Sequence, residues 1–122
     1  MKTDDFLYID KDSRPWGEYY VIHDEKKYKI KRIEVNPSSR LSYQYHNGRA
    51  ETWIIINGKA KVLIDGFSKE VKSGDTVLIP RKSKHRIENI SNETLIFIEI
   101  QTGEYFDEDD IVRIEDDYNR IK

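Results

Sequence analysis

Short apolar segments separated by turn residues occupy most of this 122-residue chain, and their spacing limits the fold more than any other feature. From residue 18 to residue 101, alternating or continuous apolar runs recur roughly every 8–12 residues, which is typical of a β-sandwich or barrel. Helical periodicity is almost absent there. We therefore predict an all-β domain.

Two dipeptides that tolerate positive φ divide the middle of the chain. They are Asn57-Gly58 and Asp65-Gly66, and they lie at the two ends of one short segment, residues 59–65. Apolar and polar residues alternate along this segment, so one face should meet the core and the other water. The pattern predicts a hairpin at each dipeptide and a meander of at least three strands.

Two later segments are more continuously apolar. Residues 76–79 are followed by Pro80, which ends a strand because it has no N–H for the ladder. Residues 95–100 form the second segment, and we predict both to be central strands. The acidic tail at 107–120 has an apolar spacing that fits a short helix and a strand about equally well.

The chain length suits a single domain with one core. We expect this core at about residues 18–101, between an N-terminal arm at 1–17 and an acidic C-terminal segment at 102–122. A short chain buries a smaller fraction of its surface on folding, which favours a homodimer formed through an exposed sheet.

The charges and the cysteine count exclude several functions. The chain has 21 basic and 23 acidic residues, so no overall basic field exists to hold a nucleic acid. Cysteine is absent, which excludes disulfides and thiolate metal sites. The charged start and the lack of any run of about 18 apolar residues predict a cytoplasmic protein without a membrane segment.

Histidine is scarce, yet two of the three histidines lie near other residues of ligand type. Gln44 and His46 are two apart on a predicted strand, so their side chains leave the same face. Glu51 follows after a loop, and His85 comes just after a strand end. Such a mixed set suits zinc, manganese, iron, cobalt or nickel, and we predict a metal site here. His23 is interpreted as a surface residue.

These candidate ligands belong to two spaced motifs. The first contains Gln44-Tyr45-His46, Glu51 and Gly58, and the second contains Gly74, Pro80, His85 and Asn89. Their order and spacing resemble the two cupin motifs. The resemblance implies a double-stranded β-helix, a jelly-roll barrel with short irregular N- and C-terminal extensions, and a metal ion in its mouth.

Further segments extend the resemblance over nearly the whole chain after the first dozen residues. They are Arg14-Pro15-Trp16-Gly17 and residues 41–46, 49–53, 98–103, 108–113 and 117–118. In this order they resemble the type II mannose-6-phosphate isomerase domain. General cupins have a second histidine where Gln44 stands, and the isomerase family uses glutamine. Ser38, Lys82 and Asn119 occupy positions where glycine is usual, and a charged Lys82 beside the mouth would alter access.

The resemblance implies an enzyme, a metal-dependent aldose–ketose isomerase that interconverts mannose 6-phosphate and fructose 6-phosphate. Such an activity supplies mannose phosphates for GDP-mannose and polysaccharide synthesis. The metal, for which zinc is the expected ion, would polarise the carbonyl, and a base would move the proton. A separate mannose-1-phosphate guanylyltransferase is the expected pathway partner. The alternatives are a non-catalytic sugar- or metal-binding cupin and a cupin enzyme for another phosphosugar or a nucleotide sugar.

Cationic residues are the candidates for holding the phosphate, because guanidinium forks and ammonium groups match its oxygens. Arg49 and Arg113 are favoured, and Arg14, Lys31, Lys84 and Arg86 are further candidates. For the general base, four alternatives stay open: Glu99, Glu104, Lys84 and a water molecule on the metal.

Overall fold

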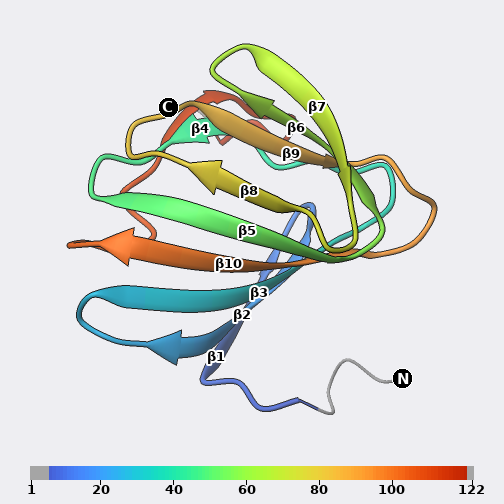
Figure 1. Ribbon diagram of the computed structural model, residues 1–122. Helices are drawn as coiled ribbons and strands as arrows, with labels where there is room; N and C mark the ends of the chain where they lie inside the picture. The colour runs from blue at the N-terminus through green and yellow to red at the C-terminus, as the bar shows by residue number, and fades with distance from the viewer. Residues whose placement is uncertain (1–5, 121–122) are drawn as a thin grey trace.

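The structure consists of two antiparallel sheets that pack face to face (Figure 1). It is a computed structural model, and it describes residues 6–120, so the ends of the predicted arm and tail, 1–5 and 121–122, lie outside the described residues. The larger sheet has six strands in the order β1-β2-β3-β10-β5-β8. These strands are β1 Asp10–Arg14, β2 Gly17–Asp24, β3 Tyr28–Val35, β10 Leu95–Gly103, β5 Arg49–Asn57 and β8 Thr76–Ile79.

The smaller sheet has five strands in the order β11-β4-β9-β6-β7. They are β11 Val112–Glu115, β4 Tyr43–Tyr45, β9 His85–Asn89, β6 Lys59–Ile64 and β7 Phe67–Lys72. Across residues 6–120 every regular element is a strand, which confirms the all-β prediction, and the same part of the chain has no helix able to cross a membrane.

The core lies between the sheets. Trp53, Ile55, Phe97, Val62 and Ile87 are each at most 1% exposed and come from both sheets. Their burial follows from the period of two along each strand, which sends alternate side chains inward. Burying a side chain of this size contributes about 1.5–3 kcal/mol, so these residues fix how the two sheets face each other.

The Asn57-Gly58 turn differs from the prediction. It connects β5 to β6, and these strands lie in different sheets, so no hairpin forms there. The reason is that β10 and β8 already occupy both edges of β5. Gly58, with φ of 92°, lets the chain turn from one sheet into the other. The second predicted hairpin is confirmed, because β6 pairs with β7 across Asp65-Gly66.

The prediction of two central strands is half right. β10 lies between β3 and β5 and is central. β8 is an edge strand, and in it the exposed Thr76 and Leu78 alternate with the buried Val77 and Ile79. In a four-residue strand the apolar run cannot distinguish an edge from a centre, because Leu78 is exposed although it is apolar.

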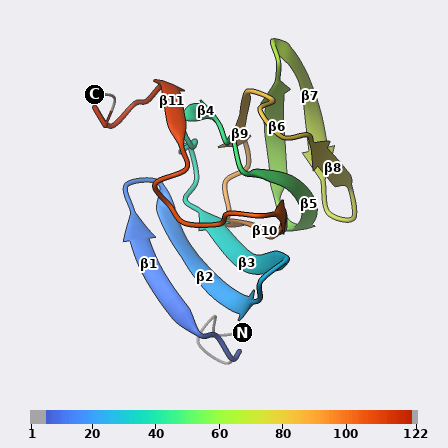
Figure 2. The ribbon, with the colours of Figure 1, turned by 90° about the vertical axis from the view of Figure 1, so that its left-hand side faces the viewer.

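The tail forms a strand instead of a helix. β11 pairs antiparallel with β4, which places the tail at the edge of the smaller sheet. Between β10 and β11 the chain crosses the end of the barrel at which β10 ends, as the red segment in Figure 2 shows. The acidic tail is therefore part of the fold, and it covers one end of the core.

The outward face of the larger sheet carries several apolar side chains. Ile54 of β5 pairs with Ile98 of β10, and both are half-buried. Ile56 and Leu78 on the same face are 50% and 69% exposed. An antiparallel sheet usually presents polar residues to water on such a face. The homodimer formed through an exposed sheet stays a prediction.

Three residues that replace family glycines have left-handed backbones. The φ angles of Ser38, Lys82 and Asn119 are 61°, 69° and 59°. Asparagine tolerates this conformation, whereas lysine is strained in it. We expect Lys82→Gly to be more stable than Lys82→Ala by about 1 kcal/mol, because both lose the charge and only glycine relieves the strain. Urea unfolding measures the difference, and equal stabilities would contradict it.

Candidate metal centre

At one end of the barrel, the inward-facing residues change from apolar to polar. Along β5, the inward positions pass from Ile55 and Trp53 to Glu51 and Arg49. Along β10 the same change leads from Phe97 to the polar residues that follow it. Both strands therefore build the core with one half and a buried polar site with the other.

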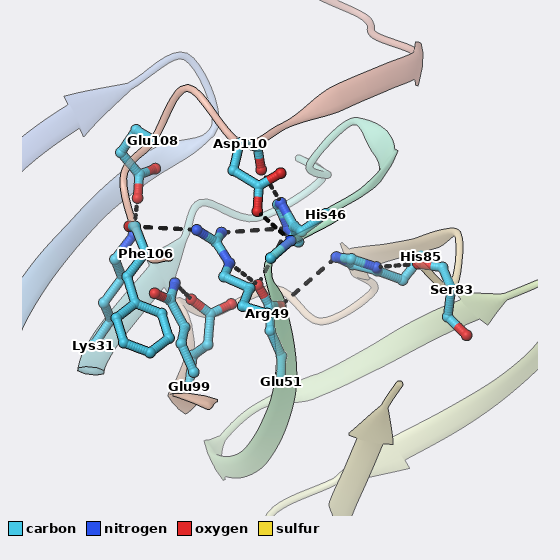
Figure 3. Close-up of polar contacts among 12 residues, drawn as sticks. Lys31, His46, Arg49, Glu51, Ser83, His85, Glu99, Phe106, Glu108 and Asp110 are labelled. Carbon is cyan, nitrogen blue, oxygen red and sulfur yellow. Dashed lines mark hydrogen bonds and ion pairs between the residues drawn. The ribbon is translucent and has the colours of Figure 1, made fainter. Parts of the chain in front are cut away.

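Three ligand-type side chains meet in this site. Nitrogen and oxygen atoms of His46, Glu51 and His85 all lie within 4.8 Å of one another. His46 Nε2 is 3.2 Å from Glu51 Oε2, and His85 Nε2 is 3.7 Å from Glu51 Oε1 (Figure 3). The three residues are at most 3% exposed, so they form a compact site shielded from water.

The two imidazole rings are held by their other nitrogens. His46 Nδ1 donates to the carbonyl oxygen of Asp110 at 2.6 Å, and His85 Nδ1 donates to that of Ser83 at 2.9 Å. With Nδ1 protonated, Nε2 of each neutral ring carries the lone pair that can bind a metal. Backbone acceptors of this kind orient metal-binding histidines in many proteins.

Among the buried side-chain atoms that have no hydrogen-bond partner within the described residues, two belong to predicted metal ligands. They are Nε2 of His85 and Oε1 of Gln44. Gln44 of β4 pairs directly with His85 of β9, so the two side chains are neighbours on the inner face. Buried polar atoms are rarely left unpaired. A divalent cation would satisfy both atoms at once, and therefore the four predicted ligands fit a metal ion.

Burial and the neighbouring charges shift the pKa of each residue of the cluster. Burial acts against the charge of Glu51, but His46, His85 and Arg49 lower its pKa well below the usual range. Burial lowers the pKa of His85, which keeps that imidazole neutral. Burial also opposes the charge of His46, but the hydrogen bond to Glu51 raises its pKa.

Arg49, a predicted phosphate ligand, lies against the cluster of His46, Glu51 and His85. Its Nε donates to Glu51 Oε2 at 3.1 Å, and its NH2 group is 3.3 Å from His46 Nε2. The side chain is buried and also reaches the carbonyl oxygen of Phe106 at 3.5 Å. Arg49 therefore supports the ionised form of Glu51 and stands between the cluster and the tail (Figure 3).

A cavity beside the cluster is lined by His46 and Glu51, and Glu99 is the one predicted base that also lines it. It is 6% exposed, and burial together with the nearby charge of Glu51 raises its pKa to about 7. Trp53 Nε1 donates to Glu51 Oε1 at 3.1 Å and to Glu99 Oε1 at 3.2 Å, while Gln101 donates to Glu99 Oε2 at 2.7 Å. These contacts fix the Glu99 carboxyl beside the cluster.

The other predicted site residues divide into two groups. Arg14, Lys31 and Arg113 line the cavity. Lys84 and Arg86 do not line it, and we do not retain them as phosphate ligands; the exposed Glu104 does not line it either. Arg86 lies on the opposite face of β9 from His85 and Ile87 and donates to the carbonyl oxygen of Leu41. His23 is half-buried and paired with Glu25, away from the cavity.

Sequence reasoning missed three contributions from the tail. Asp110 accepts from the backbone N–H groups of Asn47 and Gly48 at 2.9 and 2.8 Å, which ties the tail to the loop after His46. Glu108 pairs with the buried Lys31, and Arg120 lines the cavity. Nothing in the local pattern marks these residues, because only the pairing of β11 with β4 brings the tail across the barrel end.

Solved structures of cupins share this architecture. A Schizosaccharomyces pombe Cnp3 cupin domain matches with a TM-score of 0.71 and 12% identity, covering 84% of this chain and 72% of its own. A Lactobacillus farciminis oxalate decarboxylase in a formate complex matches with a TM-score of 0.75 and 19% identity, covering 86% of this chain and 33% of its own. The fold is therefore a cupin jelly-roll, and it carries a His–Glu–His cluster at one end of the barrel.

The sequence places the chain within a family. The family model described as mannose-6-phosphate isomerase C-terminal matches residues 4–116, so the chain belongs to this family. A mannose-1-phosphate guanylyltransferase of Escherichia coli is 43% identical over 108 residues, which are 88% of this chain and 23% of that protein. The alginate biosynthesis protein AlgA of Pseudomonas aeruginosa is 41% identical over 107 residues, 88% of this chain and 22% of that protein. The chain thus spans less than a quarter of these relatives.

Proposed function

We propose that this protein is a metal-dependent isomerase that interconverts mannose 6-phosphate and fructose 6-phosphate. The observation that carries the proposal is the buried cluster of His46, Glu51 and His85 in a chain of the isomerase family. Two members of the cluster, His46 and Glu51, line one cavity with Glu99. The relatives named for guanylyltransferase and alginate synthesis support a role in supplying GDP-mannose.

Four side chains would hold the metal: Gln44, His46, Glu51 and His85. Two imidazoles with a carboxylate and an amide oxygen suit zinc, which we propose as the ion. When bound, the ion polarises the sugar carbonyl and stabilises the negative charge that develops on its oxygen. Arg49 keeps Glu51 ionised, and the backbone acceptors at Asp110 and Ser83 hold the two rings in position.

The isomerisation moves one proton from C2 to C1 and a second from O2 to O1, so that the carbonyl passes from C1 to C2. Glu99 is the proposed base for the carbon-bound proton, because it is a buried carboxyl outside the proposed ligand set that lines the cavity. It accepts from the same Trp53 Nε1 atom as Glu51. Its Oε atoms would take the proton from C2 and return it to C1, and the proton on O2 would pass to O1 through solvent water. The contacts from Trp53 and Gln101 hold this carboxyl in place through both transfers.

Substrate entry requires the tail to move. The cavity encloses about 60 Å³, whereas pockets for small molecules commonly hold about 300 Å³ or more. The segment between β10 and β11 covers the site and is attached to it through the Lys31–Glu108 pair and the Asp110 contacts. Outward movement of this segment opens the cavity to a hexose phosphate, and its return excludes water.

A coupled assay across zinc, manganese, iron, cobalt and nickel tests the proposal. We expect turnover of mannose 6-phosphate by the metal-loaded protein and none after chelation. If no ion supports turnover while the folded protein binds sugar phosphates, the protein is a binding module and the proposal fails. If another phosphosugar alone reacts, the enzyme class holds and the substrate assignment fails.

A further inference from the structure

We propose that Arg113, with Arg14 and Arg120 beside it, forms the subsite that holds the phosphate group of the substrate. The proposal rests on the proposed function, since it assigns the far end of the same substrate. All three arginines line the cavity that contains Glu51 and His46. The subsite and the metal cluster thus open into one space.

Arg113 is placed by the pairing of the tail. In the register of β11 against β4, Arg113 lies directly opposite Gln44, a proposed metal ligand. Directly opposed residues on antiparallel strands project from the same face, so the guanidinium lies next to the metal cluster. Pairing of the tail strand therefore brings an arginine and a metal ligand to the same cavity.

The Nε atom of Arg113 is buried and has no hydrogen-bond partner within residues 6–120. A buried donor that lacks a partner is costly, and the cost is greater when the group is charged. A phosphate oxygen is a suitable acceptor, because guanidinium and phosphate match in charge and in fork geometry. The unpaired donor identifies Arg113 as the centre of an anion site.

Two further guanidinium groups lie near Arg113. Burial and the charge of Arg120 lower the pKa of Arg113, and the charge of Arg14 acts in the same direction. Each neighbour has one carboxylate partner: Arg14 pairs with Asp12 at 3.0 Å, and Arg120 pairs with Asp116 at 2.7 Å. Three cations with two paired acids leave one surplus positive charge, which attracts a phosphate group.

The other cationic side chains that line the cavity form ion pairs within it. Lys31 is buried against Glu108 and also lies 4.2 Å from the centre of the Tyr19 ring. Arg49 is paired with Glu51. The charge of each is thus balanced inside the site. The subsite therefore selects phosphate monoesters of sugars, held by their phosphate at the arginines and reaching the metal cluster with the carbonyl end.

The test compares Arg113→Gln with Arg81→Gln, which removes an exposed arginine outside the cavity lining. Binding of inorganic phosphate is measured by calorimetry, and KM and kcat for mannose 6-phosphate are measured on the metal-loaded protein. We expect Arg113→Gln to weaken phosphate binding and to raise KM by about 10- to 100-fold, the loss typical of a hydrogen bond to a charged group. Metal content should not change, and Arg81→Gln should behave as wild type.

Arg113→Lys serves as a second variant that keeps the charge. It should fall between wild type and Arg113→Gln, because an ammonium group cannot form the fork. If wild type isomerises the sugar phosphate and Arg113→Gln leaves both KM and phosphate affinity unchanged, the subsite is disproved and the proposed function stands. If wild type turns over no sugar phosphate yet binds inorganic phosphate in an Arg113-dependent way, the subsite stands and the proposed function fails.

Discussion

Replacing His85 by alanine is expected to abolish isomerase activity and to lower metal affinity. The change removes one of two imidazoles from a cluster whose atoms lie within 4.8 Å of one another. Loss of a residue that only orients a ligand commonly costs about 10- to 100-fold in affinity, so loss of a ligand should cost more. Elemental analysis of the purified protein and calorimetric titration with zinc measure the effect.

His23→Ala is the matched control for this change. His23 is half-buried and pairs with Glu25, and it does not line the cavity, so its loss should leave both metal content and activity intact. His85→Gln keeps a buried polar side chain in case alanine destabilises the fold, and circular dichroism reports on folding. A folded His85 variant with wild-type zinc affinity would refute the assignment of this residue as a ligand.

Replacing Glu99 by glutamine is expected to lower kcat by about 10²- to 10⁴-fold, the usual contribution of a general base. Glutamine keeps the volume of the side chain, so the core around Trp53 should be preserved. Metal content should also stay at the wild-type level, because Glu99 is outside the proposed ligand set. Steady-state kinetics with mannose 6-phosphate, together with metal analysis of the same sample, separate the two effects.

Glu104→Gln and Lys84→Gln are the controls, because both residues were candidate bases from the sequence. Both are exposed, and neither lines the cavity. Their variants should retain wild-type kcat. A Glu99→Gln variant with undiminished kcat would eliminate Glu99 as the base, and a large loss in either control variant would identify a different one.

The clustering of the predicted ligands was predictable from the sequence because their placement depends mainly on local rules. Gln44 and His46 share a face by the period of two, and the strand end at Pro80 puts His85 at the same end of the barrel. Positions 38 and 82 have left-handed φ angles although neither residue is glycine, because the turns require that geometry.

Long-range features were not predictable from local pattern. The Asn57-Gly58 turn has the composition of a hairpin, and only the occupation of both edges of β5 reveals that the chain changes sheet. Arg49 was expected at the phosphate, yet its ion pair with Glu51 places it at the metal cluster. Arg120 was not predicted as a site residue, because its place in the cavity lining depends on where the tail lies after β11 pairs with β4.

The most direct test of the proposed activity is proton NMR of mannose 6-phosphate incubated with the zinc-loaded protein. Signals of fructose 6-phosphate should grow until the two sugars reach equilibrium, and the growth should stop when a chelator is added. The His85→Ala protein should leave the spectrum unchanged. Mannose 6-phosphate that persists unaltered with the folded wild-type protein and every divalent ion tried would contradict the assignment as an isomerase.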